Sequence, residues 1–116
     1  IEIAQEQLRD IFSSPTAGNI SIESIQKVVA DNYQISVSDL KGKKRDKKFT
    51  VPRQIALFIA KEITEYTYSE LGIEFGGRDH STVMHSCDKI KELMTTDPTL
   101  NSKIKLLIRE IKEFKK

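Results

Sequence analysis

The chain has little of what several protein classes require. Its 116 residues include a single cysteine, Cys87, so no disulfide framework is possible within it, and we expect a reducing compartment such as the cytoplasm. Five glycines and three prolines are too few for a collagenous or low-complexity chain. The sequence has no run of 18 or more apolar residues, which excludes a transmembrane helix. Neither G-x-x-x-x-G-K-[ST] nor G-x-G-x-x-G occurs, so we expect no nucleotide-binding site.

The N-terminal stretch differs in character from the rest of the chain. Apolar residues recur at helical spacing within Ala4–Phe12, and residues 13–19, rich in small and polar side chains, interrupt the pattern. We expect a connector helix and linker over residues 1–18, followed by one domain over residues 19–116. Acidic side chains on its polar face make this helix a poor candidate for an acidic phospholipid surface, so lipid binding is only a weak expectation. Because the chain begins at Ile1 rather than at methionine, we also expect it to be a piece of a longer protein.

Positive charge is concentrated in one segment. The whole chain carries a net charge of +2, yet residues 41–61 hold eight basic side chains against one acidic side chain. The flanking residues 1–40 and 62–95 are both net acidic. A local positive field of this density attracts polyanions, although a solvated surface without any partner would have the same composition. The pattern favours nucleic acid as a partner and leaves the solvated surface open.

The sequence after residue 20 follows helical spacing in several segments. The expected helices span residues 21–32, 52–66, 68–75, 79–94 and 100–114. We also expect a short turn capped by Ser38, a loop over Lys43–Thr50, and Pro52 at the first position of the central helix. No segment shows sustained alternation of apolar and polar residues, so the sequence predicts an all-α, compact helical bundle without a sheet.

The stretch from Tyr68 to Met94 has the pattern of a helix-turn-helix, with Gly76-Gly77 at the turn. The first turn of its second helix carries His80, Ser81 and Thr82, whose side chains can contact base edges in a major groove. A helix-turn-helix also occurs in helical proteins that never bind DNA. The motif therefore favours DNA binding without establishing it.

Residues next to this turn have two possible functions each. Asp79 can cap the second helix and can also accept a hydrogen bond from a cytosine amino group. Arg78 and the free N–H groups at the helix start favour a phosphate oxygen. His85 could contact a phosphate or contact nothing.

Metal binding and catalysis are poorly supported. His80 and His85 are five residues apart and point about 140° away from each other on a helix, unlike the i, i+4 ligands of zinc sites. Cys87 falls on the apolar stripe, and a buried thiol behaves as a small hydrophobic group rather than as a nucleophile. We expect no metal ligands, no catalytic residues and no cofactor in this chain.

Two motifs resemble those of one known family. Residues 76–87, GGRDHSTVMHSC, resemble the signature of the C-terminal DNA-binding domain of the bacterial chromosomal replication initiator, DnaA. Residues 52–56, PRQIA, followed by AKE at residues 60–62, resemble a second motif of that family. The resemblance extends from about Ser21 to Phe114.

The resemblance implies a Trp-repressor-like fold that binds double-stranded DNA at replication-origin elements, the DnaA boxes, as one monomer per box. It implies a cytoplasmic, nucleoid-associated protein that regulatory proteins could bind on its DNA face. It also implies that ATP and Mg²⁺ bind an ATPase module that is not in this chain.

The resemblance further implies roles for individual residues. The recognition helix would enter the major groove, while Arg45 would reach the adjacent minor groove. The implied base-reading residues are Arg45, Asp79, His80, Ser81 and Thr82. The implied DNA-backbone contacts are Arg53, Gln54, Lys61, Thr64, Tyr68, Ser69, Arg78 and His85. Ser81 stands where the family commonly has Thr, and Ser69 stands where Pro is frequent but is expected to remain a good cap; both departures should shade sequence preference.

Two other functions stay open. A protein-interaction module would expose a large apolar face on residues 100–114. A transcription regulator with the same helix-turn-helix would usually need a dimer and a palindromic site.

Overall fold

The computed structural model describes residues 20–113, which form six helices and no strand. The helices are α1 (Ile22–Asn32), α2 (Val37–Lys41), α3 (Lys47–Ile63), α4 (Tyr68–Glu74), α5 (His80–Thr96) and α6 (Pro98–Glu113). The predicted all-α fold is confirmed. The expected connector helix over Ala4–Phe12, and with it the division at residue 18, lies outside the described residues.

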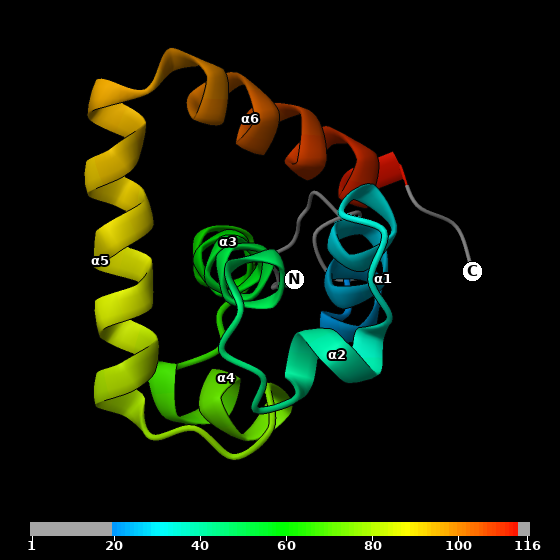
Figure 1. Ribbon diagram of the computed structural model, residues 1–116, viewed down its shortest axis with the longest axis vertical. Helices are drawn as coiled ribbons and strands as arrows, with labels where there is room; N and C mark the ends of the chain where they lie inside the picture. The colour runs from blue at the N-terminus through cyan, green and yellow to red at the C-terminus, as the bar shows by residue number, and fades with distance from the viewer. Residues whose placement is uncertain (1–19, 114–116) are drawn as a thin grey trace, which may run out of the picture.

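Helix α3 forms the centre of the domain. It is seen end-on in Figure 1, with the other helices arranged around it, and it contacts each of them. Residues 55–60 are all buried, so the middle of this helix is covered on every side rather than along one stripe. Helix α3 is therefore the support on which the other elements are placed.

Helix α3 begins earlier than the sequence pattern predicts. Residues 47–50 are helical, so the expected loop over Lys43–Thr50 is wrong in its second half, and Pro52 lies inside the helix rather than at its first position. The first turn lacks an apolar period, but Phe49 is buried and its N–H donates to the carbonyl of Asp46 at 2.9 Å. Burial of one aromatic ring against the rest of the domain thus decides where the helix starts. The connection left between α2 and α3, residues 42–46, is short and is called the basic loop below.

The helix starts are fixed by side-chain caps. Ser21, the residue at which the sequence predicts this helix to begin, caps α1, because its hydroxyl accepts from the N–H of Ser24 at 3.1 Å. The predicted cap Ser38 is wrong: Ser36 performs this role for α2 by accepting from the N–H of Asp39 at 2.9 Å.

The start of α4 is also set by a different residue from the one expected. Thr67 and Glu70 form a reciprocal capping box. The N–H of Thr67 donates to the Glu70 carboxylate at 2.8 Å, and the N–H of Glu70 donates to the Thr67 hydroxyl at 3.1 Å. Ser69, which was expected to provide a cap, is instead an exposed residue in the first turn of α4.

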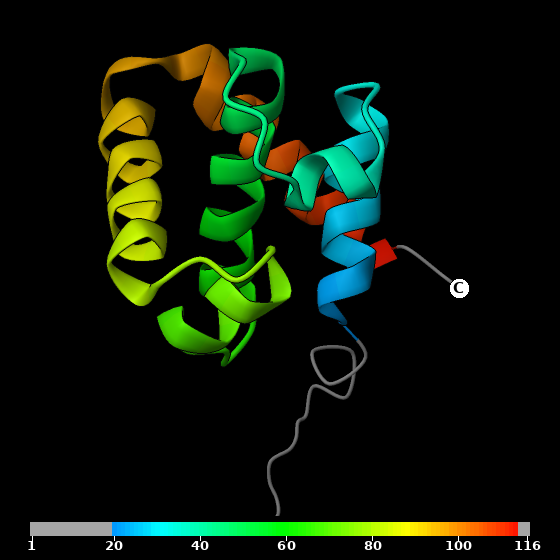
Figure 2. The same cartoon turned by 60° about the horizontal axis from the view of Figure 1, so that its bottom comes forward.

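The helix-turn-helix is formed by α4, a glycine turn and α5, which pack together and on α3 (Figure 2). The N–H groups of Gly77 and Arg78 both donate to the carbonyl of Gly72 at 2.9 Å. A side chain at Gly72 would collide with the carbonyl of Arg78, so only glycine allows this close approach. The direction in which α5 leaves the turn is therefore set by backbone contacts.

The apolar stripe of α6 packs on the domain itself. Ile104, Leu107 and Ile111 are buried in the core, and among the large apolar side chains of α6 only Leu106, 47% exposed, faces outward in the described part of that helix. The broad apolar face that would support a protein-interaction module is absent from residues 100–113. Within residues 20–113 no helix has the length and apolar character needed to cross a membrane.

Candidate nucleic-acid interface

The first turn of α5 presents polar side chains to solvent. Asp79 caps the helix as predicted, because its carboxylate accepts from the N–H of Thr82 at 3.1 Å. Hydrogen bonding from the Thr82 side chain, and then from its main-chain N–H, lowers the pKa of the Asp79 carboxyl below its ordinary value, with a smaller contribution from nearby His80. His80, Ser81 and Thr82 are all exposed. The helix start therefore offers one fixed carboxylate and the exposed side chains of His80, Ser81 and Thr82 on the same rigid turn.

The outward face of α5 changes in charge along its length. Val83, Cys87 and Ile90 form its buried side. Ser81 and His85, one turn apart, are both exposed on the other side. Further along the exposed surface come two acidic side chains, Asp88 and Glu92, and two basic ones, Lys89 and Lys91, so this part of α5 has no net charge. The N-terminal turns of α5 differ from this part in presenting uncharged hydrogen-bonding side chains, which are suited to contact base edges.

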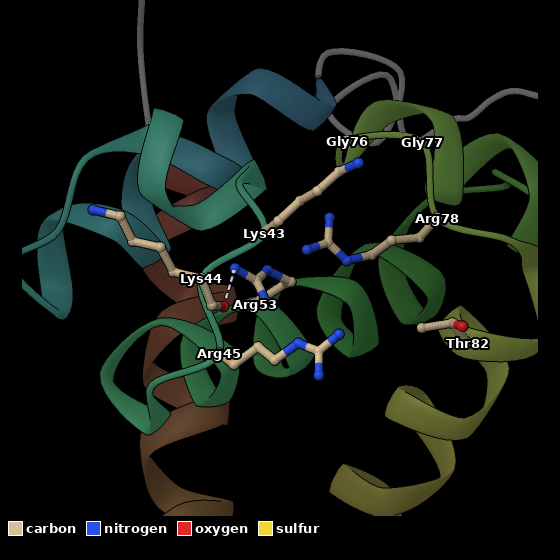
Figure 3. Close-up of a pocket in the computed structure, with 8 residues that line it drawn as sticks. All are labelled: Lys43, Lys44, Arg45, Arg53, Gly76, Gly77, Arg78 and Thr82. Carbon is tan, nitrogen blue, oxygen red and sulfur yellow. Dashed lines mark hydrogen bonds between the residues drawn. The ribbon is translucent and has the colours of Figure 1, made fainter.

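A basic hollow of about 340 Å³ lies between the basic loop and the glycine turn. Its lining residues are Lys43, Lys44, Arg45, Arg53, Gly76, Gly77, Arg78 and Thr82. Figure 3 shows Arg45 and Arg78 extending into this space from opposite sides, with Thr82 at its border. The fold thus brings together three predicted DNA-contacting arginines and one predicted base reader that are up to 37 residues apart in sequence.

Two lysines of the basic loop line the hollow but were not singled out as site residues from the sequence. The signal that could have found Lys43 and Lys44 is their position inside the basic segment 41–61. Lys44 is the more constrained of the two, because its ammonium lies 3.2 Å from the Asp39 carboxylate and 4.9 Å from the centre of the Phe49 ring. The Lys44 hydrogen bond lowers the pKa of the Asp39 carboxyl.

Arg53 lies at the inner end of the hollow and is only 6% exposed. Its Nε donates to the carbonyl of Leu40 at 2.7 Å, and its Nη2 donates to the carbonyls of Asp39 and Lys44 at 3.3 and 3.2 Å. Burial, and then the positive charge of Arg78, lower the pKa of this guanidinium. The N–H groups of Arg53 thus donate to main-chain carbonyls of α2 and of the basic loop. Contact between Arg53 and a DNA phosphate stays a prediction.

Arg78, which leads into α5, also binds main-chain carbonyl groups. Its Nη1 donates to the carbonyl of Lys41 at 3.1 Å and to that of Phe75, and its Nη2 donates to the carbonyl of Gly42. Partial burial lowers the pKa of this guanidinium. Arg78 thus connects the glycine turn to the start of the basic loop.

The remaining predicted DNA-backbone residues lie along α3 and at the start of α4. Lys61 donates to the carbonyl of Tyr66 at 3.3 Å and lies 4.7 Å from the centre of the Tyr68 ring. Thr64 is the C-cap of α3, and its hydroxyl donates to the carbonyl of Ala60 at 2.6 Å. Gln54 is half-buried on α3 and Ser69 is exposed on α4. Burial raises the pKa of the Tyr68 hydroxyl, so this ring stays a neutral hydrogen-bonding group.

We expect the only thiol of the chain to be unreactive. Cys87 is buried, and this burial, with the nearby Asp88 carboxylate, raises the pKa of the Cys87 thiol to about 11. At pH 8 iodoacetamide should modify the native chain far more slowly than the chain in urea, as measured by mass spectrometry. Equal rates in the two states would show that Cys87 is accessible in the fold. Among the residues described, no group of three or more His, Cys, Asp and Glu is placed to hold a metal ion.

Comparison with known proteins identifies relatives of this chain. The family model described as "Bacterial dnaA protein helix-turn-helix" matches residues 22–90. The chromosomal replication initiator protein DnaA of Treponema denticola is 51% identical over 110 residues, which cover 95% of this chain and 24% of the relative. The proteins of the same name from Treponema pallidum and Methylobacillus flagellatus are 49% and 42% identical over 113 residues, covering 97% of this chain and 24% of each relative.

The match falls on the part of the chain that carries the geometry described above. Residues 22–90 include the basic loop, α3, the glycine turn and the exposed first turns of α5. The chain spans about a quarter of the length of the curated relatives it matches. The matched family is a helix-turn-helix rather than an ATPase, and it supports binding of double-stranded DNA. The chain belongs to the bacterial DnaA helix-turn-helix family.

Proposed function

We propose that this chain recognises DnaA boxes in duplex DNA, as one monomer per box, and is the DNA-recognition part of a bacterial replication initiator. The observation that carries the proposal is the shared basic hollow, which has Arg45 on one side and the first turn of α5 beside the other (Figure 3). A duplex seated over this hollow would receive α5 in its major groove and Arg45 in the adjacent minor groove.

The proposed base readers differ in how firmly the fold holds them. One oxygen of Asp79 caps α5, so its other oxygen is presented in a fixed direction to a cytosine amino group. His80, Ser81 and Thr82 project from the same rigid turn and would contact neighbouring bases. Arg45 projects from a short loop and would sense minor-groove width and its acceptors.

The proposal also covers the cofactors and the cellular location of the full-length protein. We propose that DNA recognition by this chain uses no cofactor, and that ATP and Mg²⁺ act in another part of the family's full-length proteins. The site of action would be the nucleoid in the bacterial cytoplasm, where regulatory proteins could compete for the same basic face.

The proposal is tested by fluorescence anisotropy on two short duplexes, one carrying a DnaA box and one scrambled, each at low and moderate salt. We expect tight binding to the box with a preference of at least several hundred-fold, since specific sites exceed non-specific ones by roughly a thousandfold or more. Equal and steeply salt-dependent binding to both duplexes would mean that the basic loop acts alone and that α5 does not read bases. Absence of binding to either duplex would overturn the proposal.

A further inference from the structure

The basic loop, which connects α2 to α3, has few main-chain hydrogen bonds of its own, although the Lys44 side chain contacts Asp39 and Phe49. Residues 43–46 are exposed, and in them no backbone N–H donates a hydrogen bond within the described part of the chain. Short loops of this kind sample many conformations unless other parts of the fold hold their carbonyl groups. The position of Arg45 therefore depends on what binds the loop from outside.

Two arginines bind the loop and its preceding helix from different directions. Arg53, on α3, holds the carbonyls of Leu40 and Lys44, which lie just before the loop and in its middle. Arg78, beside the glycine turn, holds the carbonyls of Lys41 and Gly42. Within residues 20–113, each hydrogen-bond partner of these two guanidinium groups is a main-chain carbonyl. The loop is thereby joined both to the central helix and to the turn that starts α5.

The glycine turn supplies a second contact with the same region. Gly76 has a φ of +94° and lies so close to the end of α2, where the basic loop begins, that a side chain there would collide with the carbonyl of Lys41 and crowd Arg78. Gly77 also has a positive φ, +81°, but a side chain there would have no atom within 4 Å. Of the two turn glycines, Gly76 therefore contacts the start of the basic loop and Gly77 does not.

We propose that Arg53 and Arg78 are positioning residues that fix the basic loop relative to α5, so that Arg45 and the first turn of α5 read one DNA site as a unit. The inference rests on the proposed function for its DNA readout, but the fixed loop is a property of the free chain. Under this inference the two arginines affect sequence specificity indirectly, by positioning Arg45. The family resemblance implies instead that they contact DNA phosphates directly.

The DNA test is a double-mutant cycle between Arg78→Met and Arg45→Ala in the full 116-residue chain. We expect Arg78→Met to lower box affinity about tenfold in the otherwise unchanged chain and less than about twofold in the Arg45→Ala background, because the loop position matters only while Arg45 is present. In that background the slope of log affinity against log salt should change by much less than one unit, because Arg78 adds to the field around the site without contacting a phosphate. Lys105→Met, an exposed cation on α6, is the matched control. Additive losses, or a slope lowered by about one unit in both backgrounds, would show a direct phosphate contact and overturn the inference.

A second test needs no DNA and therefore separates the two proposals. Trypsin cleavage after residues 43–45, measured by mass spectrometry, reports opening of the loop, and cleavage after Lys61 in α3 reports unfolding of the whole domain. We expect Arg78→Met and Gly76→Ala to raise the ratio of loop to α3 cleavage about tenfold, whereas Gly77→Ala leaves the ratio unchanged. An unchanged ratio in both of the first two variants would overturn the inference even if the box is bound. If the chain shows no preference for the DnaA box while the ratio of loop to α3 cleavage rises as expected, the proposed function is wrong. The inference that the two arginines fix the loop in the free chain is then still supported.

Discussion

Replacing His80 with alanine should reduce the preference for a DnaA box over a scrambled duplex by about 1–3 kcal/mol, the usual worth of a good base contact. His80 is exposed on the first turn of α5, and its side chain belongs neither to the core nor to the cap of that helix. Its removal should therefore leave the fold intact and change only contacts with DNA. Anisotropy titrations on the two duplexes measure the effect. An equal loss of affinity for both duplexes would contradict a base-reading role.

The matched control for this prediction is a cation that is expected to contact the DNA backbone. Lys61→Ala should weaken binding to all sequences alike and lower the slope of log affinity against log salt by about one unit. Because the Lys61 ammonium also donates to the carbonyl of Tyr66 and lies over the Tyr68 ring, the free energy of unfolding of this variant should be measured alongside.

Replacing Phe75 with alanine should lower the free energy of unfolding by about 3–5 kcal/mol. Phe75 is completely buried where α4 ends, and its removal would leave a cavity below the glycine turn. Its carbonyl accepts from Arg78, so a shift of the backbone here would also loosen the connection to the basic loop. Urea unfolding followed by circular dichroism gives the change, which would be a large part of the stability of a small domain.

A control for this substitution is available two residues earlier, in the last turn of α4. Ile73 is 72% exposed, so Ile73→Ala should change the free energy of unfolding by no more than about 0.5 kcal/mol. A loss at Ile73 as large as that at Phe75 would mean that the cost arises from the helix itself rather than from burial of the Phe75 ring.

The parts of the fold that the sequence predicts well are those encoded by neighbouring residues. The caps Ser21 and Asp79 lie three residues before the N–H groups they accept from, and the stripe on α5 repeats at helical spacing. The same local patterns predict which residues form the exposed first turn of α5. These features depend on nothing that lies far away in the chain.

The features that the sequence does not predict depend on distant contacts. Helix α3 starts at Lys47 because Phe49 is buried, although basic residues in a first turn are unfavourable to the helix dipole. Arg53 and Arg78 are indistinguishable from surface cations in the sequence, since their carbonyl partners lie 9 to 14 and up to 37 residues away. Both arginines line the basic hollow, as a DNA-contacting role would require, but the sequence pattern gives no sign of their internal hydrogen bonds.

The choice of carbonyl partners for Arg53 and Arg78 also bears on how quickly the chain meets its ligand. A carboxylate partner would cancel each positive charge, whereas a neutral carbonyl accepts the hydrogen bond and leaves the net charge in place. Both guanidinium groups therefore add to the field of the neighbouring lysines while they hold the loop. We expect the association rate constant with DNA to exceed that of an uncharged surface and to fall steeply as salt is added.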